Sequence, residues 1–463
     1  MQLHIRRARV IDPQSDFHDQ VVDILIEHGT IKTISPSTSE TSSIHQGNTG
    51  LQHVPLSFGE GRGEAPHEPH KGDASHEPHN VPLSFGEGRG EVFISPGWVD
   101  VLADYREPGF EHKETLASGL AAAAAGGFTD VFLAPNTQPV LSNKSSIQYV
   151  LQKALDSVVS LHPLGAITQN IEGKELAEML DMRANGAVAF SDGWKPVQNA
   201  NLMLKALEYV KALHGTVLQI PVDASLSAGG LMHEGLVSTG LGMAGIPELA
   251  ETLIVHRDIE LVRYTGSKMH ITGISTATSV DMVRKAKAEG LMVTCSVTPY
   301  HLALTDDALK TYDSIYKVTP PLRTEADRQA LIAGLNDGTI DCIATHHRPQ
   351  EWDAKTKEFE YAAEGMAVQE IAFNILWHTV KDQVSIDRLV EAMTIIPRDI
   401  FGLPVHDIKE GSKASLTIFT TSGRHALATD EVKSASRNNP FIGRELPGRV
   451  IGIINKGQIH LNK

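Results

Sequence analysis

From residue 92 onward the chain repeats one pattern that constrains its fold more than any other feature: short apolar runs alternate with amphipathic stretches. Two of these stretches, ETLASGLAAAAAGG and SVDMVRKAKAEG, have helical spacing and end in glycine. Strands that alternate with helices predict a parallel α/β barrel of the TIM type over residues 93–394, with its active site where the strands end in polar residues. The eight strand-like runs are VFISPGWVDV, DVFLAP, LHPLGAI, AVAFSD, VLQIPVD, MHITGIS, LMVTCSV and DCIATHH.

Both ends of the chain have a different pattern. LHIRRARVID and VVDILIEHGTIKTIS near the start alternate apolar with polar residues, as half-exposed strands do. SLTIFTT and GRVIGIINKGQIHL near the end are also strand-like. We therefore predict that residues 1–44 and 395–463 together form a small β-sandwich domain beside the barrel.

Residues 45–92 form a repetitive insertion. VPLSFGEGRGE occurs at 54–64 and again at 81–91, and HEPH occurs at 67–70 and at 76–79. This composition has too few apolar residues to offset the entropy of ordering, so it predicts a disordered segment. The histidines of the two HEPH copies, His67, His70, His76 and His79, have the chemistry to chelate a divalent ion. An unchanged repeat instead indicates a duplication without a fixed ligand geometry, and this interpretation is favoured.

Composition excludes several classes of function. The net charge of −15 leaves no basic surface for nucleic acid or anionic lipid. Two cysteines are too few for a disulfide framework or a cysteine zinc site. No apolar run reaches the ~18 residues of a membrane span, and the first residues lack a signal-peptide core. We expect a cytoplasmic protein that forms a homo-oligomer.

Eight strings outside the 45–92 insertion are distinctive in combination: REPGFEHKET (106–115), AAAAGGFT (122–129), APNTQPV (134–140), AFSDG (189–193), LMHEGLVSTGLGMAGIP (231–247), STATSVDMVRKAKAEGLMVTCSVTPYHL (275–302), KVTPPLR (317–323) and NPFIGRELPGRV (439–450). In this order they resemble the long, type I form of dihydroorotase, a member of the amidohydrolase superfamily. The resemblance covers the chain outside the 45–92 insertion. It implies a barrel of the metal-dependent hydrolase type and the reversible ring closure of carbamoyl-aspartate to dihydroorotate. A divalent metal would activate water there and an aspartate would move the proton.

Most metal ligands that the resemblance implies are replaced. In the Asp-x-His-x-His-x-x-Arg string, Leu102 and Asp104 stand at the two histidine positions. The histidine of the AHxED-like string falls on Ile220, and that of the HxCHxST-like string on Gly273. The carboxylate of the AFSDD-like string is kept as Asp192. Zinc needs about three or four protein ligands, so the chain is expected to hold no metal.

The catalytic aspartate of the TDHAPH-like string falls on His346. Two interpretations follow. Asp104, Asp192 and His346 would make a rebuilt zinc site if all three converge. Alternatively, Asp104 and His346 form an ion pair or hydrogen bond that fills the vacated pocket. The second is favoured because the first requires three side chains to converge by chance.

The substrate side is better preserved. Arg106 and Asn136 match the pair that holds the substrate carboxylate in the family, and a guanidinium fork suits a carboxylate. A structural interpretation is equally open, in which Arg106 pairs with Asp104 or Asp192 and Asn136 caps a loop. Thr319 replaces the asparagine of KVNPPLR-like strings, and Gln350 replaces the last histidine of the TDHAPH-like string.

Three functions are compatible with these residues. The favoured one is a dihydroorotase-like protein of pyrimidine biosynthesis without catalytic activity, which acts as a scaffold partner of aspartate transcarbamoylase, as the resemblance implies. The second is an active dihydroorotase or cyclic amidohydrolase with a rebuilt zinc site. The third is a sensor that binds a small carboxylate through Arg106 and Asn136.

Overall fold

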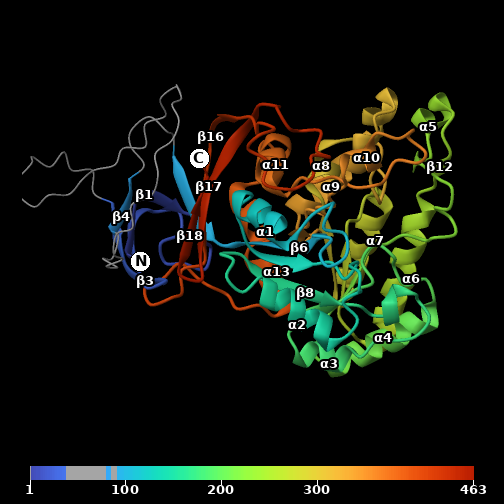
Figure 1. Ribbon diagram of the computed structural model, residues 1–463, viewed down its shortest axis with the longest axis horizontal. Helices are drawn as coiled ribbons and strands as arrows, with labels where there is room; N and C mark the ends of the chain where they lie inside the picture. Colours follow the sequence, from blue (N-terminus) through green and yellow to red (C-terminus); the bar gives the residue numbers. More distant parts are fainter. Residues whose placement is uncertain (1, 38–79, 85–90, 463) are drawn as a thin grey trace, which may run out of the picture.

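The computed structural model describes residues 2–37, 80–84 and 91–462 as a barrel with a sheet beside it (Figure 1). Most of the 45–92 insertion, including the four HEPH histidines, lies outside the described residues. Residues Asn80–Ser84 form strand β4, which pairs in parallel with β1 (Gln2–Val10).

Eight parallel strands form the barrel. They are hydrogen-bonded in sequence order from β6 to β15, with the short β11 (Met232–His233) and β12 (Gly245–Ile246) pairing outside them. A parallel bridge between Ala103 and His347 joins the last strand to the first and closes the ring. The barrel strands are β6 (Trp98–Ala103), β7 (Phe128–Leu133), β8 (Ser160–Gly165), β9 (Ala189–Phe190), β10 (Val217–Gln219), β13 (Met269–Thr272), β14 (Val293–Val297) and β15 (Cys342–Ile343).

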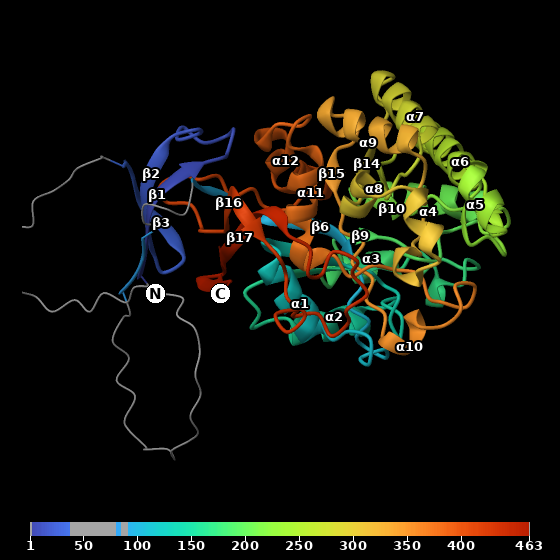
Figure 2. The same ribbon diagram turned by 90° about the horizontal axis from the view of Figure 1, so that it is seen from above.

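Helices lie around the outside of these strands (Figure 2). The two predicted glycine-ended helices are present: Thr115 caps the first with its side chain, Gly126 ends it, and Gly290 follows the other at a φ of +78°. The helices are α1 (Leu116–Ala125), α2 (Lys144–Lys153), α3 (Met179–Ala184), α4 (Ala200–Ala212), α5 (Leu236–Leu241), α6 (Leu249–Thr265), α7 (Ala277–Ala288), α8 (Pro299–Ala303), α9 (Glu325–Asn336), α10 (Trp352–Lys355), α11 (Ala372–Val380), α12 (Ile386–Met393) and α13 (Ile395–Phe401).

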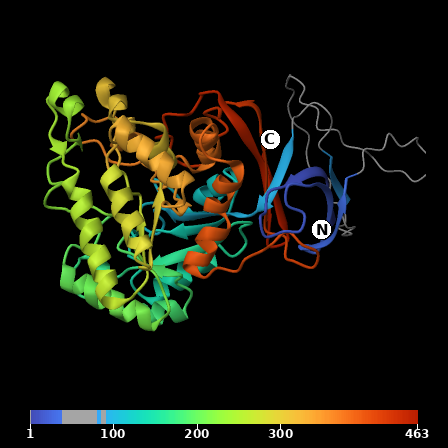
Figure 3. The ribbon, with the colours of Figure 1, turned by 180° about the vertical axis from the view of Figure 1, so that it is seen from behind.

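Strands from both chain ends form the second sheet, so that both termini lie on the same side of the barrel (Figure 3). The prediction of a barrel with a small β domain made by both chain ends is confirmed, and the strands of this domain form one continuous sheet. Its order is β18 (Gln458–Leu461), β17 (Leu446–Asn455), β16 (Leu416–His425), β5 (Val92–Pro96), β1, β2 (Val21–Glu27) and β3 (Thr30–Pro36), with β4 also paired to β1.

Two elements lie across the predicted domain boundaries. Strand β5 pairs with β1 and β16 of the end sheet, although the predicted barrel begins at residue 93. Helix α13 packs against β6 of the barrel, although the predicted end domain resumes at residue 395. Among the described residues, no helix combines the length and apolarity needed to cross a membrane.

An aromatic cluster fixes the end sheet to the barrel. Trp98 of β6 is fully buried, and its ring centroid lies 5.3 Å from Phe419 of β16 and 5.2 Å from Phe373 of α11. Its indole nitrogen donates to Ser95 Oγ at 3.0 Å, and its backbone nitrogen donates to Thr417 Oγ1 at 3.2 Å. The Trp98 ring is buried against both elements, and both of its nitrogens donate hydrogen bonds. This joint therefore fixes the end sheet against the barrel.

Candidate functional site

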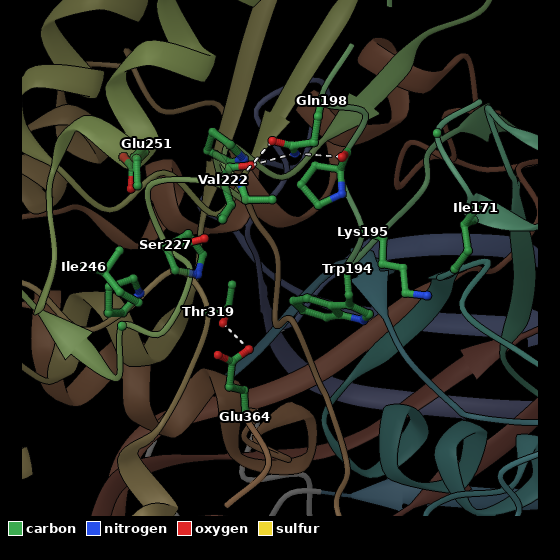
Figure 4. A pocket seen from close by; sticks show the side chains of 18 of the residues that line it. Ile171, Trp194, Lys195, Gln198, Val222, Ser227, Ile246, Glu251, Thr319 and Glu364 are labelled. Atoms are coloured by element: carbon green, nitrogen blue, oxygen red, sulfur yellow. Dashed lines mark hydrogen bonds between the residues drawn. The ribbon is translucent and has the colours of Figure 1, made fainter. Parts of the chain in front are cut away.

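A cavity of about 500 Å³ opens at the carboxyl end of the barrel strands, where the active sites of TIM barrels lie. The loops after β9 and β10 form part of its wall, and the segment between α8 and α9 forms another part (Figure 4). The polar residues that matter below are Trp194, Lys195, Glu251, Thr319, Arg323 and Glu364.

Two of the four replaced histidine positions now belong to the hydrophobic interior. Leu102 and Ile220 are buried and are part of one apolar cluster with Phe132, Leu164 and Leu218. Burying a leucine or isoleucine side chain contributes about 1.5–3 kcal/mol to folding. The expected metal centre is therefore replaced on this side by ordinary core packing.

A third position, Gly273, is filled by its neighbour. A β-carbon at residue 273 would lie 2.4 Å from Cε1 of His346, and Gly273 has a φ of +75°. His346 is fully buried and its Nε2 shares a hydrogen bond of 2.8 Å with Thr272 Oγ1. Burial lowers the pKa of His346 well below its ordinary value, so the ring is neutral. The imidazole occupies the space that a histidine at residue 273 would need.

Asp104, at the fourth position, faces a different partner from the one predicted. Its carboxylate lies 3.1 Å from Nη1 of Arg106, and the Asp104 side chain is fully buried. The predicted Asp104–His346 contact is therefore wrong, because each residue is bound elsewhere: Asp104 to Arg106 and His346 to Thr272. Asp104 and Arg106 are close in sequence, so they can pair without any contact across the barrel.

Asp192, the retained carboxylate, is held by the loop that follows β8. Its Oδ1 accepts hydrogen bonds from the backbone nitrogens of Ile167 (2.8 Å) and Thr168 (2.9 Å), and its Oδ2 accepts one from Thr168 Oγ1 at 2.5 Å. Burial raises the pKa of Asp192 to about 6 against the effect of these hydrogen bonds. Both carboxylate oxygens of Asp192 therefore accept hydrogen bonds from Ile167 and Thr168.

These residues do not fit a zinc ion. Leucine, isoleucine and glycine side chains offer no lone pair, Asp192 accepts hydrogen bonds from Ile167 and Thr168, and Asp104 pairs with Arg106. Within residues 2–37, 80–84 and 91–462, no group of three or more histidine, cysteine, aspartate or glutamate side chains has the geometry to hold a metal ion. The structure thus does not bring Asp104, Asp192 and His346 together as a ligand set.

The predicted carboxylate clamp is occupied by internal contacts. Arg106 pairs with Asp104, as in its structural interpretation. The Asn136 amide donates to the Asp192 carbonyl at 3.1 Å and accepts from the Trp194 backbone nitrogen at 3.1 Å, so it braces the loop after β9. Neither residue lines the cavity. Binding of a substrate carboxylate by this pair stays a prediction.

The sequence analysis missed the side chains that fill the mouth. The Trp194 ring packs edge-on against His346, with centroids 5.2 Å apart. On Trp194 lies the guanidinium of Arg348, 4.5 Å from the ring centroid. Arg348 also lies 3.4 Å from Glu364. One signal was available, because Arg348 stands at the alanine of the TDHAPH-like string.

The two departing substrate-side residues also have internal roles. Thr319 donates its hydroxyl to the Glu364 carboxylate. Gln350 accepts from Lys113 Nζ at 2.8 Å and donates to the Glu364 carbonyl at 2.7 Å. Both therefore tie down the segment that carries Glu364.

A buried ion pair forms one wall of the cavity. Arg323 Nη2 lies 3.5 Å from Glu251, and both side chains are almost fully buried. Ser275 Oγ donates to Glu251 and accepts from Arg323 Nε at 3.0 Å, while Arg323 Nη1 lies 3.1 Å from His233 Nδ1. The charges on this wall of the cavity are therefore paired with each other.

Known proteins that resemble the sequence agree on one family. Residues 90–279 match the sequence model of the family described as Dihydro-orotase-like. A dihydroorotase from Syntrophus aciditrophicus (strain SB) is 37% identical over 461 residues, which is 99% of each chain. The chain belongs to the dihydroorotase family. Another dihydroorotase, from Pelotomaculum thermopropionicum, is 44% identical over 368 residues, covering 79% of this family member and 86% of the relative.

Solved structures support the same fold for this dihydroorotase family member. An L-hydantoinase (dihydropyrimidinase) from Arthrobacter aurescens superposes with a TM-score of 0.80 at 19% identity, covering 100% of this chain and 96% of that one. A dihydropyrimidinase from Brevibacillus agri NCHU1002 gives a TM-score of 0.76 at 18% identity, over 100% and 95%. The barrel with an end sheet is thus an architecture that this chain shares with both structures.

Proposed function

We propose that this chain is a dihydroorotase-like protein of pyrimidine biosynthesis that has lost the metal-dependent reaction and acts as a scaffold partner of aspartate transcarbamoylase. One observation carries the loss of activity: the His346 ring occupies the space beside Gly273 that a ligand side chain would need. Family membership supports the pathway. The partner rests on the resemblance to dihydroorotase-like chains that lack the metal centre.

The chemistry of the site supports this proposal over an active enzyme. Hydrolysis of a cyclic amide needs an activated water, and Leu102, Ile220 and Gly273 offer no side-chain ligand at three of the four histidine positions of the family. His346, at the position of the proton-moving aspartate, is neutral and bonded to Thr272. A scaffold needs the barrel and its surface, which the aromatic joint and the core preserve.

Metal content and turnover test the loss of activity. The purified full-length protein is assayed with dihydroorotate and with N-carbamoyl-aspartate, first with added zinc and then with a chelator. We expect no turnover and less than a tenth of an equivalent of bound zinc. Chelator-sensitive turnover that Asp192→Ala abolishes would establish the alternative, a rebuilt zinc site at Asp104, Asp192 and His346.

Sedimentation tests the partner. The protein is mixed with aspartate transcarbamoylase from the same organism, and the mixture is compared with each component alone. We expect a faster-sedimenting complex whose transcarbamoylase activity survives dilution better than that of the free enzyme. Independent sedimentation at micromolar concentrations would remove the scaffold role and leave the loss of activity untouched.

A further inference from the structure

A second cavity, of about 530 Å³, lies at the other end of the barrel, where the end sheet meets the amino ends of the strands. Ser160, the first residue of β8, lines it from the barrel. Pro404 and His406 line it from the segment between α13 and β16. No described residue lines both this cavity and the one at the carboxyl end of the strands, so the two are separate sites.

Two hairpin turns from opposite ends of the chain meet at the rim of this second cavity. His28 and Gly29 join β2 to β3, and Lys456 and Gly457 join β17 to β18. The turns touch, since a β-carbon on Gly29 would lie 3.0 Å from the Gly457 α-carbon. His28 and Lys456 have positive φ angles of 51° and 53°, at turn positions that favour asparagine or glycine. Both turns therefore place a long nitrogen-bearing side chain where a shorter one would suit the backbone better.

The lining of this cavity is basic, although the protein has a net charge of −15. Its described residues include two lysines and two histidines but no aspartate or glutamate. These four residues are His28, His406, Lys413 and Lys456. A concave surface lined by one sign of charge attracts ligands of the opposite sign, so this cavity favours an anion.

Two carboxylates lie behind the lining, where they affect the pKa of its half-buried histidine, and both already have cationic partners. Asp130 lies 2.7 Å from Arg398 Nη2 and 2.8 Å from His162 Nε2. Asp407 lies 2.8 Å from Lys409 Nζ. These pairs compensate the two negative charges, so they do not cancel the positive charge inside the cavity.

Several donors in the lining are unused. Lys413 Nζ makes no hydrogen bond or ion pair with the described part of the chain. Ser415 is 3% exposed, and its Oγ is buried without a partner. Ser160 Oγ accepts from Asn455 Nδ2 at 3.1 Å, and its own proton has no acceptor among the described residues. A ligand with several acceptor oxygens would satisfy these groups.

We propose that this cavity is a binding site for a phosphate group, either the free ion or a small phosphate monoester. Lys413 and Lys456 supply the positive charge, and the hydroxyls of Ser160 and Ser415 donate to the phosphate oxygens. The site is independent of the lost metal reaction and of the scaffold role, because none of its residues belongs to the cavity at the carboxyl end of the strands.

The kind of donor favours phosphate over a carboxylate. Lysine binds phosphate as a point charge, whereas a carboxylate is matched best by an arginine fork, and no arginine is among the described residues that line the cavity. Lys456 Nζ donates to the carbonyls of Leu155 and Ser157 at 2.8 Å each, which fixes the ammonium and leaves one N–H for a ligand. The cavity volume lies in the range of small-molecule sites, so an organic group on the phosphate has room.

His406 adds a neutral donor to the site. Burial lowers the pKa of His406, with Arg398 and Lys413 acting in the same direction and Asp130 and Asp407 against it. The imidazole is therefore neutral at pH 7 and offers one N–H. The charge of the site at this pH thus depends on its lysines.

Titration calorimetry of the full-length protein with ribose 5-phosphate at low salt tests the proposal. Lys413→Met removes a charge that holds no other group in place, and we expect it to weaken binding about fivefold to tenfold. Ser415→Ala removes a hydroxyl without a partner, and we expect binding about threefold weaker with no fall in the midpoint of thermal unfolding. A serine with a purely structural role would lower the midpoint and leave the affinity unchanged.

Lys32→Met is the matched control, because it removes one positive charge from an exposed lysine of the same sheet that does not line the cavity. We expect its affinity to change less than about twofold. Lys413→Arg keeps the charge and should keep the affinity within about threefold. Ribose without the phosphate should not bind.

Inorganic phosphate in the same titration distinguishes the two sources of the phosphate group. Tighter binding of ribose 5-phosphate than of inorganic phosphate supports a phosphate monoester, and equal binding supports the free ion. The absence of binding by both would overturn the proposal, as would an unchanged affinity in Lys413→Met. Equal affinity for succinate would also overturn it, because the site would then be a general anion site.

Discussion

Two buried polar regions of this protein differ in how completely their groups are paired. In the loop that precedes α1, Glu114 accepts hydrogen bonds from Ser118, Ser434, Ala435 and His347. Burial raises the pKa of the Glu114 carboxyl, but the hydrogen bonds and His347 outweigh this effect and leave the pKa below its ordinary value. Both carboxylate oxygens of Glu114 are therefore hydrogen-bonded.

The barrel mouth leaves polar atoms without partners at similar depth. His346 Nδ1, Asp104 Oδ2, Arg106 Nε and Trp194 Nε1 have no hydrogen bond in the described structure. An unpaired buried polar atom costs about 1–3 kcal/mol, so a region maintained for stability alone would avoid it. The Glu114 cluster and the barrel mouth thus differ in how fully their buried polar atoms are paired.

The largest predicted effect is at Glu114. Glu114→Ala leaves four donors without their acceptor, and we expect it to lower the free energy of unfolding by about 3–5 kcal/mol. Urea titration monitored by circular dichroism measures the loss. Glu208→Ala, an exposed glutamate of α4, is the control and should change stability by no more than about 0.5 kcal/mol. A loss below 1 kcal/mol at Glu114 would contradict the comparison.

At the mouth, the predicted loss of stability comes from steric overlap at Gly273. Gly273→Ala places a methyl group 2.4 Å from His346 Cε1 at a positive φ, and we expect a cost of about 2–4 kcal/mol. Gly290→Ala has a similar φ of +78° with open space around it, so it should cost only about 1 kcal/mol. Adding His346→Ala to Gly273→Ala should recover part of the difference. Equal costs for the two glycines would show that His346 moves aside freely.

A buried histidine of strand β13 predicts a pH dependence. Burial lowers the pKa of His270 to about 3 from 6.5, so between these values the unfolded chain binds a proton that the folded chain does not. Stability therefore falls as the pH drops below 6.5, by about 1–2 kcal/mol by pH 5 for this residue.

His270→Asn should remove that part of the pH slope, measured as the free energy of unfolding in urea at pH 5, 6, 7 and 8. His112→Asn, an exposed histidine, serves as the control and should keep the full slope. An unchanged slope in His270→Asn would mean that the ring is protonated in the folded protein.

The smallest predicted change in stability comes from substituting two tryptophans. Trp98→Phe removes an indole nitrogen that donates to Ser95, so we expect a loss of about 1–3 kcal/mol from the joint. Trp194→Phe removes an indole nitrogen without a partner and keeps an aromatic ring against His346, so we expect less than about 1 kcal/mol. Thermal unfolding followed by calorimetry ranks them. A larger loss for Trp194 would reverse the comparison.

The sequence by itself determined the barrel, the end domain built from both chain ends, and the absence of histidines from the metal centre. These are properties of periodicity and residue identity, which strand and helix spacing and ligand chemistry translate directly. Leu102 and Ile220 cannot bind zinc in any fold, so their replacement of histidine was informative before any coordinates.

Only the tertiary structure decided what the residues at the family's metal-ligand positions contact. Asp104 pairs with Arg106 and not with His346, and the His346 ring lies against Gly273. Neither contact could be predicted from the sequence, because local spacing does not encode packing distances across a barrel. The Trp194–Arg348–Glu364 arrangement joins residues from three separate loops. Such contacts depend on where the closed ring of strands brings loop ends together, and that geometry exists only once the chain has folded.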